Sequence, residues 1–384
     1  MDAQALLAER KQLFSDVIAF NKPARIPMLG CVYSWKYLDA GYNLHEALYD
    51  YDIIEKCERE NIETYQFDAY SDYGTRNGMK APDALGGGAH KISPDGEAVI
   101  VHDGATMMPD EYAEYMANPV AFMWSKMFKR SAKEGLTLGD IQKAAIETLT
   151  FGQFGARMAN MYAEEYGALV TFNMNNIGML LLSPMEMLFN GIRGMKGLAL
   201  DIRKNKSQLK EYLDFAAAGN MFPLLDASIP IDGSRTVADY YTPFLGHSML
   251  STSQFGELYW PYLKKAIDFA AANNRTIYCF CESTMERFTE YFEEVPKGVL
   301  IIHLEQDDIF TIRKKLPNIA LAGGMPTSLL GHGSKEQCVD YAKKLIDELG
   351  DGFAISQNKM LSFRDDATRE NLIAVNDFVR NYQC

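Results

Sequence analysis

Cysteine is scarce in this chain, which has six cysteines among 384 residues. They are Cys31, Cys57, Cys279, Cys281, Cys338 and Cys384. Their irregular spacing lacks the pattern of a disulfide framework, and few, unpaired cysteines are typical of a reducing compartment. We therefore expect free thiols or metal ligands at these positions.

Long apolar runs and an excess of positive charge are also missing. No run approaches the ~18 apolar residues that a membrane span needs, and the chain does not start with a basic-then-apolar signal. A soluble, cytoplasmic protein is therefore predicted, with no membrane partner. The formal net charge of −13 argues against a nucleic-acid partner, because such proteins gather Lys and Arg on one face. Small molecules or proteins are the expected partners, and a homodimer stays open.

No stretch rich in glycine, serine and proline marks a domain boundary. Because α/β barrels often run past 250 residues as one domain, the length fits a single unit. We predict one domain over residues 1–384, with helical and hairpin additions in its N-terminal half.

The C-terminal half alternates short apolar runs with amphipathic segments. Such runs fit buried strands, and the amphipathic segments fit helices. Strands are predicted at 275–281, 298–305, 318–325 and 352–358, each followed by a helix. Regular alternation of this kind is typical of a closed barrel or a doubly wound sheet. We predict the closed form, a (β/α)₈ TIM barrel of the α/β class.

One of these helices carries its own start and stop signals. Ser334 and Gln337 have the spacing of a capping box, and Gly350 follows the last turn. Cys338 lies on the apolar stripe of this helix, so we expect it to pack in the core and not to bind a ligand.

The N-terminal half is less regular. Strands are predicted at 25–35, 64–70 and 167–176, a hairpin at 90–104, and mainly helical structure from 105 to 165.

Two neighbouring predicted strands carry residues that could bind a metal. Cys279 and Cys281 share one face of their strand, Glu282 lies just past its end, and His303 lies near the end of the next strand. In a barrel, both strand ends lie at the carboxyl rim, where barrel enzymes place their chemistry. Thiolate, carboxylate and imidazole ligands there would suit Zn²⁺. His247, in a predicted loop before a helix, is a further candidate ligand.

A purely structural interpretation of these residues also stays open. Cysteine is among the most buried residue types, so a cysteine in an apolar strand is usually packing. A single histidine at a strand end or a helix start is often only hydrogen-bonded to the backbone.

Several longer segments resemble the uroporphyrinogen decarboxylase superfamily, and the similarity extends over most of the chain. These segments are SPMEMLFNGIRGMKGLALDIRKNKSQL (183–209), FGELYWPYLKKAIDFA (255–270), the strand at 276–284 and NIALAGGMPTSLLGHGSKEQCVDYAKKLID (318–347). The resemblance implies a (β/α)₈ barrel. Its members include decarboxylases, methylcobamide:coenzyme M methyltransferases, and the methyltransferase components of corrinoid-dependent O-demethylases.

Two branches fit these residues poorly. The decarboxylases carry an arginine-rich segment after the first strand, but the stretch at 31–37 keeps Lys36 and Tyr37 without the arginine pair. Asp72 is similar to the decarboxylase aspartate and is a candidate catalytic carboxylate. In the thiol-activating methyltransferases a His-X-Cys pair and a later cysteine bind zinc, whereas this chain has Cys279 and Cys281 in the pair and SQNK at 356–359.

The spacing of Glu282 and His303 instead resembles the O-demethylase methyltransferases. That resemblance implies methyl transfer from a small methyl ether, expected to be aromatic, to the cobalt(I) corrinoid (cobalamin) of a separate partner protein that docks over the rim. The candidate catalytic residues are Asp72, Glu282 and His303. The candidate Zn²⁺ ligands are Glu282 and His303, with Cys281 or His247 completing the site. A decarboxylase of a small carboxylic acid and a methylcobamide:thiol methyltransferase are the alternatives.

A pocket for such an ether is expected to be aromatic, with a few polar groups to orient it. The candidate substrate-binding residues are Tyr33, Trp35, Asn175 and Asn176. Phe172 and Met325 are further candidates, although core packing explains each of these two residues better.

Overall fold

An eight-stranded, all-parallel sheet forms the centre of the molecule. The computed structural model describes residues 2–76, 78–173, 177–220 and 225–382. The strands follow the order β5-β2-β1-β10-β9-β8-β7-β6. Their bounds are β1 (Met28–Gly30), β2 (Ala69–Tyr70), β5 (Leu169–Val170), β6 (Tyr240–Phe244), β7 (Ile277–Cys281), β8 (Leu300–Leu304), β9 (Ala320–Met325) and β10 (Phe353–Gln357).

The sheet curls so that its first and last strands approach each other. A parallel bridge joins Val170 at the end of β5 to Thr236, which lies just before β6. The Val237 N–H donates to the carbonyl of Val170 at 3.0 Å. This α/β architecture is compatible with the predicted TIM-barrel-like fold. The four C-terminal strands lie where the sequence predicts them, but β6 was not predicted.

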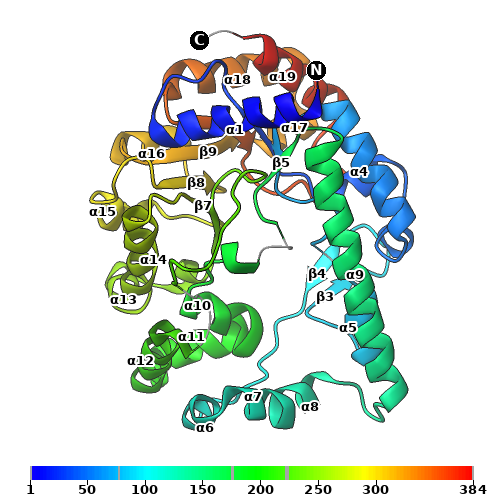
Figure 1. Cartoon of the computed structure of the whole chain (residues 1–384), viewed down its shortest axis with the longest axis vertical. Coiled ribbons are helices and arrows are strands. Elements are labelled where there is room, and N and C mark those ends of the chain that lie inside the picture. Colours follow the sequence, from blue (N-terminus) through cyan, green and yellow to red (C-terminus); the bar gives the residue numbers. More distant parts are fainter. Residues whose placement is uncertain (1, 77, 174–176, 221–224, 383–384) are drawn as a thin grey trace.

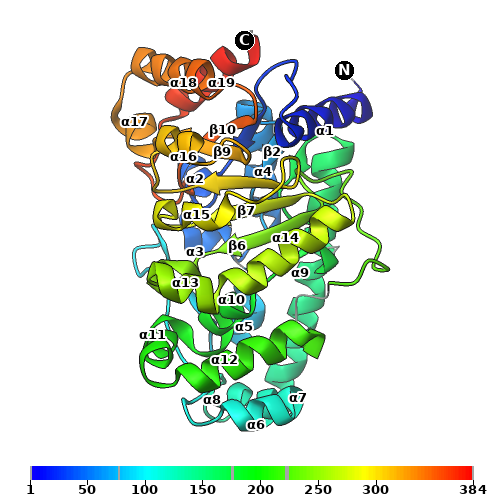
Figure 2. The same cartoon turned by 90° about the vertical axis from the view of Figure 1, so that its left-hand side faces the viewer.

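Helices cover the outer side of the sheet (Figure 2). After β1 come α2 (Trp35–Asp39), α3 (Leu44–Ala47) and α4 (Tyr51–Tyr65). After β6 to β10 come α13 (Thr252–Leu258), α14 (Trp260–Ala272), α15 (Thr289–Phe292), α16 (Ile309–Lys315), α17 (Thr327–His332), α18 (Lys335–Leu349) and α19 (Arg369–Asn381). Among the described residues, no helix is both long and apolar enough to span a bilayer.

Helix α18 begins and ends where its sequence predicts. The Ser334 side chain accepts from the Gln337 N–H and the Gln337 side chain accepts from the Ser334 N–H, which is a capping box. Gly350 follows with φ of 58°, a value that glycine adopts without strain. Cys338 is fully buried on the inner face, as predicted.

Two long insertions extend from the carboxyl end of the sheet (Figure 1). The one after β2 contains α5 (Lys80–Leu85), the predicted hairpin of β3 (His90–Ile92) and β4 (Val99–Val101), and the helices α6 (Tyr112–Ala117), α7 (Pro119–Phe122), α8 (Phe128–Ser131) and α9 (Leu138–Glu164). The one after β5 contains α10 (Pro184–Met187), α11 (Gly194–Lys204) and α12 (Lys206–Phe215). The long helix α9 runs back from the far tip to β5.

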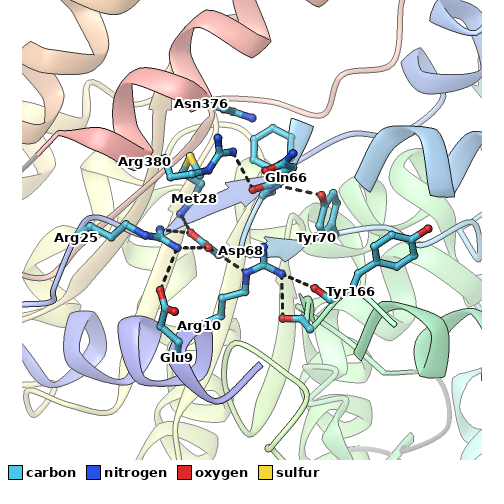
Figure 3. Close-up of polar contacts among 12 residues, drawn as sticks. Glu9, Arg10, Arg25, Met28, Gln66, Asp68, Tyr70, Tyr166, Asn376 and Arg380 are labelled. Atoms are coloured by element: carbon cyan, nitrogen blue, oxygen red, sulfur yellow. Dashed lines mark hydrogen bonds and ion pairs between the residues drawn. The ribbon is translucent and has the colours of Figure 1, made fainter. Parts of the chain in front are cut away.

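Helix α1 (Ala3–Ala19) covers the opposite, amino end of the sheet. Its Phe14, Val17 and Ile18 pack against side chains inside the barrel, such as Leu29. A buried cluster of ion pairs links α1 to this end of the sheet (Figure 3).

Asp68, at the start of β2, is the centre of that cluster. Its Oδ1 accepts from Arg10 Nε at 3.2 Å and from Arg25 Nη2 at 2.7 Å. Its Oδ2 accepts from Arg25 Nη1 at 2.7 Å and from the Met28 N–H at 2.8 Å. Both oxygens are therefore fully engaged, and they connect α1, the first loop and β1.

Candidate functional site at the carboxyl end of the sheet

Strand β7 directs its side chains alternately inward and outward. Tyr278 and Phe280 belong to the cluster inside the barrel, whereas Cys279 and Cys281 belong to the cluster between the sheet and the helices. Because side chains alternate along a strand, Glu282 continues the inward series. Glu282, and not the cysteine pair, therefore reaches the carboxyl mouth of the barrel.

Glu282 is only partly covered, and its N–H donates to the carbonyl of Phe244 at 3.1 Å. Burial raises the pKa of its carboxyl to about 7, and the neighbouring Glu305 adds to the effect against the opposing charge of Arg76. A carboxyl group with a pKa near 7 can donate a proton at neutral pH.

Arg76, in the loop after β2, is the cation beside Glu282. Its guanidinium lies 4.6 Å from the centre of the Tyr33 ring. Burial acts to lower the pKa of Arg76, but Tyr33, Tyr241 and Glu282 together raise it above its ordinary value. Within the described part of the chain, no carboxylate lies within ion-pair distance of this guanidinium. It can therefore bind an anionic group of a ligand.

Acidic side chains hold the loop that carries Glu282. Ser283 has φ of 70°, a strained value for a residue other than glycine, and its N–H donates to Glu305 Oε2 at 2.6 Å. Asp307 accepts from the N–H groups of Met285 at 2.7 Å and Glu286 at 3.1 Å. The ends of β7 and β8 are thereby linked, which fixes the position of Glu282.

Asp72, predicted as catalytic, holds the loop that carries Arg76. Its Oδ1 accepts from the N–H groups of Thr75 at 3.1 Å and Arg76 at 3.2 Å. Its Oδ2 pairs with the buried Lys36 Nζ at 2.9 Å, and Lys36 also pairs with Glu58 at 2.6 Å. The carboxylate is buried and both of its oxygens are occupied, so the structure places Asp72 behind the site as a positioning residue.

His303, also predicted as catalytic and as a metal ligand, lies wholly inside the barrel. Its Nδ1 lies 2.7 Å from the Tyr278 hydroxyl, and its Nε2 lies 2.8 Å from the carbonyl of Gln357. Because a carbonyl only accepts, Nε2 carries the proton and Nδ1 accepts from Tyr278. Burial lowers the pKa of His303 to about 4, so the ring is neutral. Both nitrogens have partners, which leaves none for a metal.

The other predicted zinc ligands, Cys281 and His247, lie on the helix side of the sheet. Cys281 Sγ is 3.9 Å from His247 Nε2, and the His247 ring stacks on Phe244 with centroids 3.8 Å apart. His247 lies in a short 3₁₀ turn before α13, and Nε2 also lies 3.2 Å from the carbonyl of Thr284. Burial raises the pKa of the Cys281 thiol well above its ordinary value, which disfavours the thiolate that zinc requires.

The sheet thus separates the predicted zinc ligands into two pairs. Cys281 and His247 lie outside it, whereas Glu282 and His303 point inward. Among the described residues, no three His, Cys, Asp or Glu side chains are arranged to hold a metal ion. The residues present do not fit the predicted zinc site, because alternation along β7 sends Cys281 and Glu282 to opposite faces.

The predicted substrate residues have different surroundings. Tyr33 lies inside the barrel mouth under Arg76. Trp35 is a core residue instead, because its ring is 2% exposed and its Nε1–H donates to the carbonyl of Ala367 at 3.1 Å. Met325 is likewise buried on the helix side. Asn175 and Asn176 lie outside the described residues.

Phe172 belongs to an aromatic wall at the mouth. Its ring centroid lies 5.6 Å from that of Tyr241, which stacks on Tyr278 at 5.9 Å. Phe172 and Tyr241 are each partly exposed, so part of this wall is accessible to a ligand.

Arg76, Tyr241 and Glu305 were not predicted from the sequence as site residues. Glu305 is the last residue of the strand predicted at 298–305 and follows the observed β8, so the rule that pointed to Glu282 could also have found it. Arg76 follows a strand across a glycine-containing loop, and Tyr241 lies on the unpredicted strand β6. Neither Arg76 nor Tyr241 belongs to a sequence motif that predicts a site residue.

No protein-family model matches this chain, and no curated protein matches it either. A solved structure, that of a methyltransferase from Methanosarcina mazei, is similar to it with a TM-score of 0.62. The alignment covers 97% of this chain and 98% of that one at 12% sequence identity. This likeness shows a shared fold.

Proposed function

We propose that this protein is a methyltransferase of the uroporphyrinogen decarboxylase superfamily that acts in O-demethylation. It takes a methyl group from a small, aromatic methyl ether and transfers it to the cobalt(I) corrinoid of a partner protein. The observation that carries the proposal is Glu282 at the end of β7, beside Arg76, with its pKa raised to about 7. The methyltransferase fold of the similar structure supports it.

Cleavage of a methyl ether needs an acid, because an alkoxide or phenoxide oxygen leaves poorly. When the carbon–oxygen bond breaks, the methyl group moves to the corrinoid, whose cobalt(I) supplies the electron pair of the new bond. The oxygen keeps the electrons of the old bond and takes the proton of Glu282. A general acid with a pKa near the working pH is best suited to this step.

Other residues at the mouth orient the donor. The faces of Phe172 and Tyr241 provide a flat apolar wall for an aromatic ring. Arg76 is available for a negatively charged substituent or for the developing charge on oxygen. No step is assigned to zinc, because the predicted ligands do not fit one site.

The test uses purified protein, cobalt(I) cobalamin and a panel of methoxylated aromatics and aliphatic methyl ethers. We expect loss of the cobalt(I) absorbance and formation of methylcobalamin only when ether, protein and cobalamin are all present. The unpaired Arg76 also favours a second candidate, a decarboxylase of a small carboxylic acid. Failure of every ether, with release of carbon dioxide from a carboxylic acid in the same preparation, would establish that alternative.

A further inference from the structure

A cavity of about 590 Å³ opens next to the barrel mouth, among α4, α5, α8 and α9. Arg76 and Lys80 form its polar wall, and the rings of Tyr51, Phe128 and Phe151 form its apolar wall. The loop at Gly78 packs tightly against this cavity, because a Cβ there would lie 2.9 Å from the Phe151 ring. Its volume is typical of a small-molecule site.

The two cations that line the cavity each lie over an aromatic ring. Lys80 Nζ lies 4.2 Å from the centre of the Tyr51 ring, as Arg76 lies over Tyr33. Neither makes an ion pair with a described residue, and no Asp or Glu is among the described side chains that line the cavity. Asp83 on α5 accepts from the Tyr49 hydroxyl, whereas the charge of Glu147 on α9 acts on Tyr51, which lines the cavity.

This arrangement is unusual in a chain with a net charge of −13. Lysine and arginine side chains elsewhere commonly have carboxylate partners, for example Lys126 with Glu111 and Glu114. Two cations that line one cavity and form no ion pair with a described residue favour the binding of an anionic group there.

A second cavity of about 560 Å³ adjoins the first and is apolar. The two share Phe128 and Ser131, so they meet at α8. Met123 and Trp124 line the second cavity and are 46% and 65% exposed. An exposed tryptophan beside methionines is typical of a binding surface and not of a core.

We propose that the two joined cavities bind an amphiphilic organic carboxylate. Its head group lies between Arg76 and Lys80, and its apolar body crosses Phe128 and covers Met123 and Trp124. The two cations favour an anionic head group. The apolar second cavity favours a hydrocarbon body longer than a single ring. This assignment goes beyond the proposed methyl transfer, and its test needs no turnover.

The probe is sodium decanoate, kept monomeric and titrated into the full-length protein while tryptophan fluorescence is followed. Of the three tryptophans, Trp124 is highly exposed, Trp260 is partly buried and Trp35 is buried, so covering Trp124 shifts the emission to shorter wavelength. Trp124→Phe should remove most of the shift while calorimetry still reports binding. Acetate, which has the head without the body, and decanol, which has the body without the charge, should each bind at least about tenfold more weakly than decanoate.

Lys80→Gln should weaken decanoate binding about tenfold or more and leave decanol binding unchanged. Lys129→Gln is the matched control, because Lys129 is exposed nearby on α8 but does not line either cavity. Equal affinities for decanoate and decanol, or equal losses in the two lysine variants, would overturn the assignment. Binding to anionic vesicles without binding of monomeric decanoate would also overturn it and would indicate a membrane surface instead.

Discussion

Charged side chains at the two ends of the sheet differ in their burial and in their pairing. At the amino end, Asp68 is 1% exposed in its side chain, and both oxygens accept from Arg10, Arg25 and the backbone (Figure 3). At the carboxyl end, Arg76 is exposed and the nearby Glu282 is partly exposed, and Arg76 makes no ion pair with a described residue.

This difference separates charges that stabilise the fold from charges that can act on a ligand. A buried charged group whose hydrogen-bonding sites are all occupied cannot bind a substrate. Removal of one member of such a cluster leaves the charges of the other members uncompensated. A half-covered acid whose pKa is near 7 keeps an exchangeable proton. The comparison predicts large activity effects at one end and large stability effects at the other.

The largest effect is expected from Glu282→Gln. This substitution keeps the shape but removes the acid, so methyl transfer should fall by about 10²–10⁴-fold. The free energy of unfolding should change by less than about 1 kcal/mol, because burial already favours the neutral form of this side chain. The rate of methylcobalamin formation and chemical denaturation together check this pair of outcomes.

The pH profile of the same reaction gives an independent check. The protonated form of Glu282 is the active acid, so kcat/KM should be level below its pKa of about 7 and fall about tenfold per pH unit above it. The residual activity of Glu282→Gln should lack this decline. A profile that rises through neutral pH would mean that Glu282 acts as a base.

At the amino end, Asp68→Asn should destabilise the fold by about 3–5 kcal/mol, because Arg10 and Arg25 lose their buried counter-charge. The control is Asp377→Asn, whose side chain is 62% exposed and pairs with Arg380; it should change stability by less than about 1 kcal/mol. Urea denaturation measures both variants. A similar small loss in each would show that the buried cluster is not needed for stability.

A smaller effect is expected from Glu58, which pairs with Lys36 behind the site. Burial raises the pKa of Glu58 to about 7, although Lys36 opposes the shift. The folded protein therefore binds more protons than the unfolded chain between about pH 4.5 and 7, so this residue's contribution to stability is lost as pH rises through that window.

Glu58→Gln should remove that contribution. The difference in unfolding free energy between the natural chain and this variant should shift by about 1–3 kcal/mol across the window. Glu60→Gln, on the same helix with a 40% exposed side chain, is the control. Identical pH slopes in all three proteins would argue against a raised pKa at Glu58.

The smallest effect is expected from Cys281→Ala on the helix side of the sheet. If the thiol only packs there, the variant should lose about 1 kcal/mol of stability, like Cys338→Ala, and methyl transfer should be unchanged within about twofold. A selective loss of activity and of bound zinc in the Cys281 variant would restore the thiol as a functional ligand.

Much of the architecture could be predicted from local patterns. The apolar runs at 275–281, 298–305, 318–325 and 352–358 are strands β7 to β10, and the Ser334 capping box starts α18. Glu282 was placed correctly just past the end of β7. Strand β6 escaped prediction because Tyr240–Phe244 contains a proline, which is depleted in strands.

The composition of the candidate site could not be predicted in the same way. Neighbouring positions in the sequence, Cys281 and Glu282, lie on opposite faces of the sheet, while Arg76 approaches Glu282 from more than two hundred residues away. Trp35 and Tyr33 are similarly close in sequence, yet only Tyr33 reaches the mouth.

The sequence by itself determined the alternation of strands and helices, the capping of α18, and the acid at the end of β7, because these depend on neighbours within a few residues. Only the tertiary structure decided which face of β7 points inward, that both His303 nitrogens are occupied, and that Arg76 lacks a carboxylate partner among the described residues. The physical reason is that hydrogen bonding, burial and charge pairing depend on contacts between distant segments, which the local pattern of a strand does not contain.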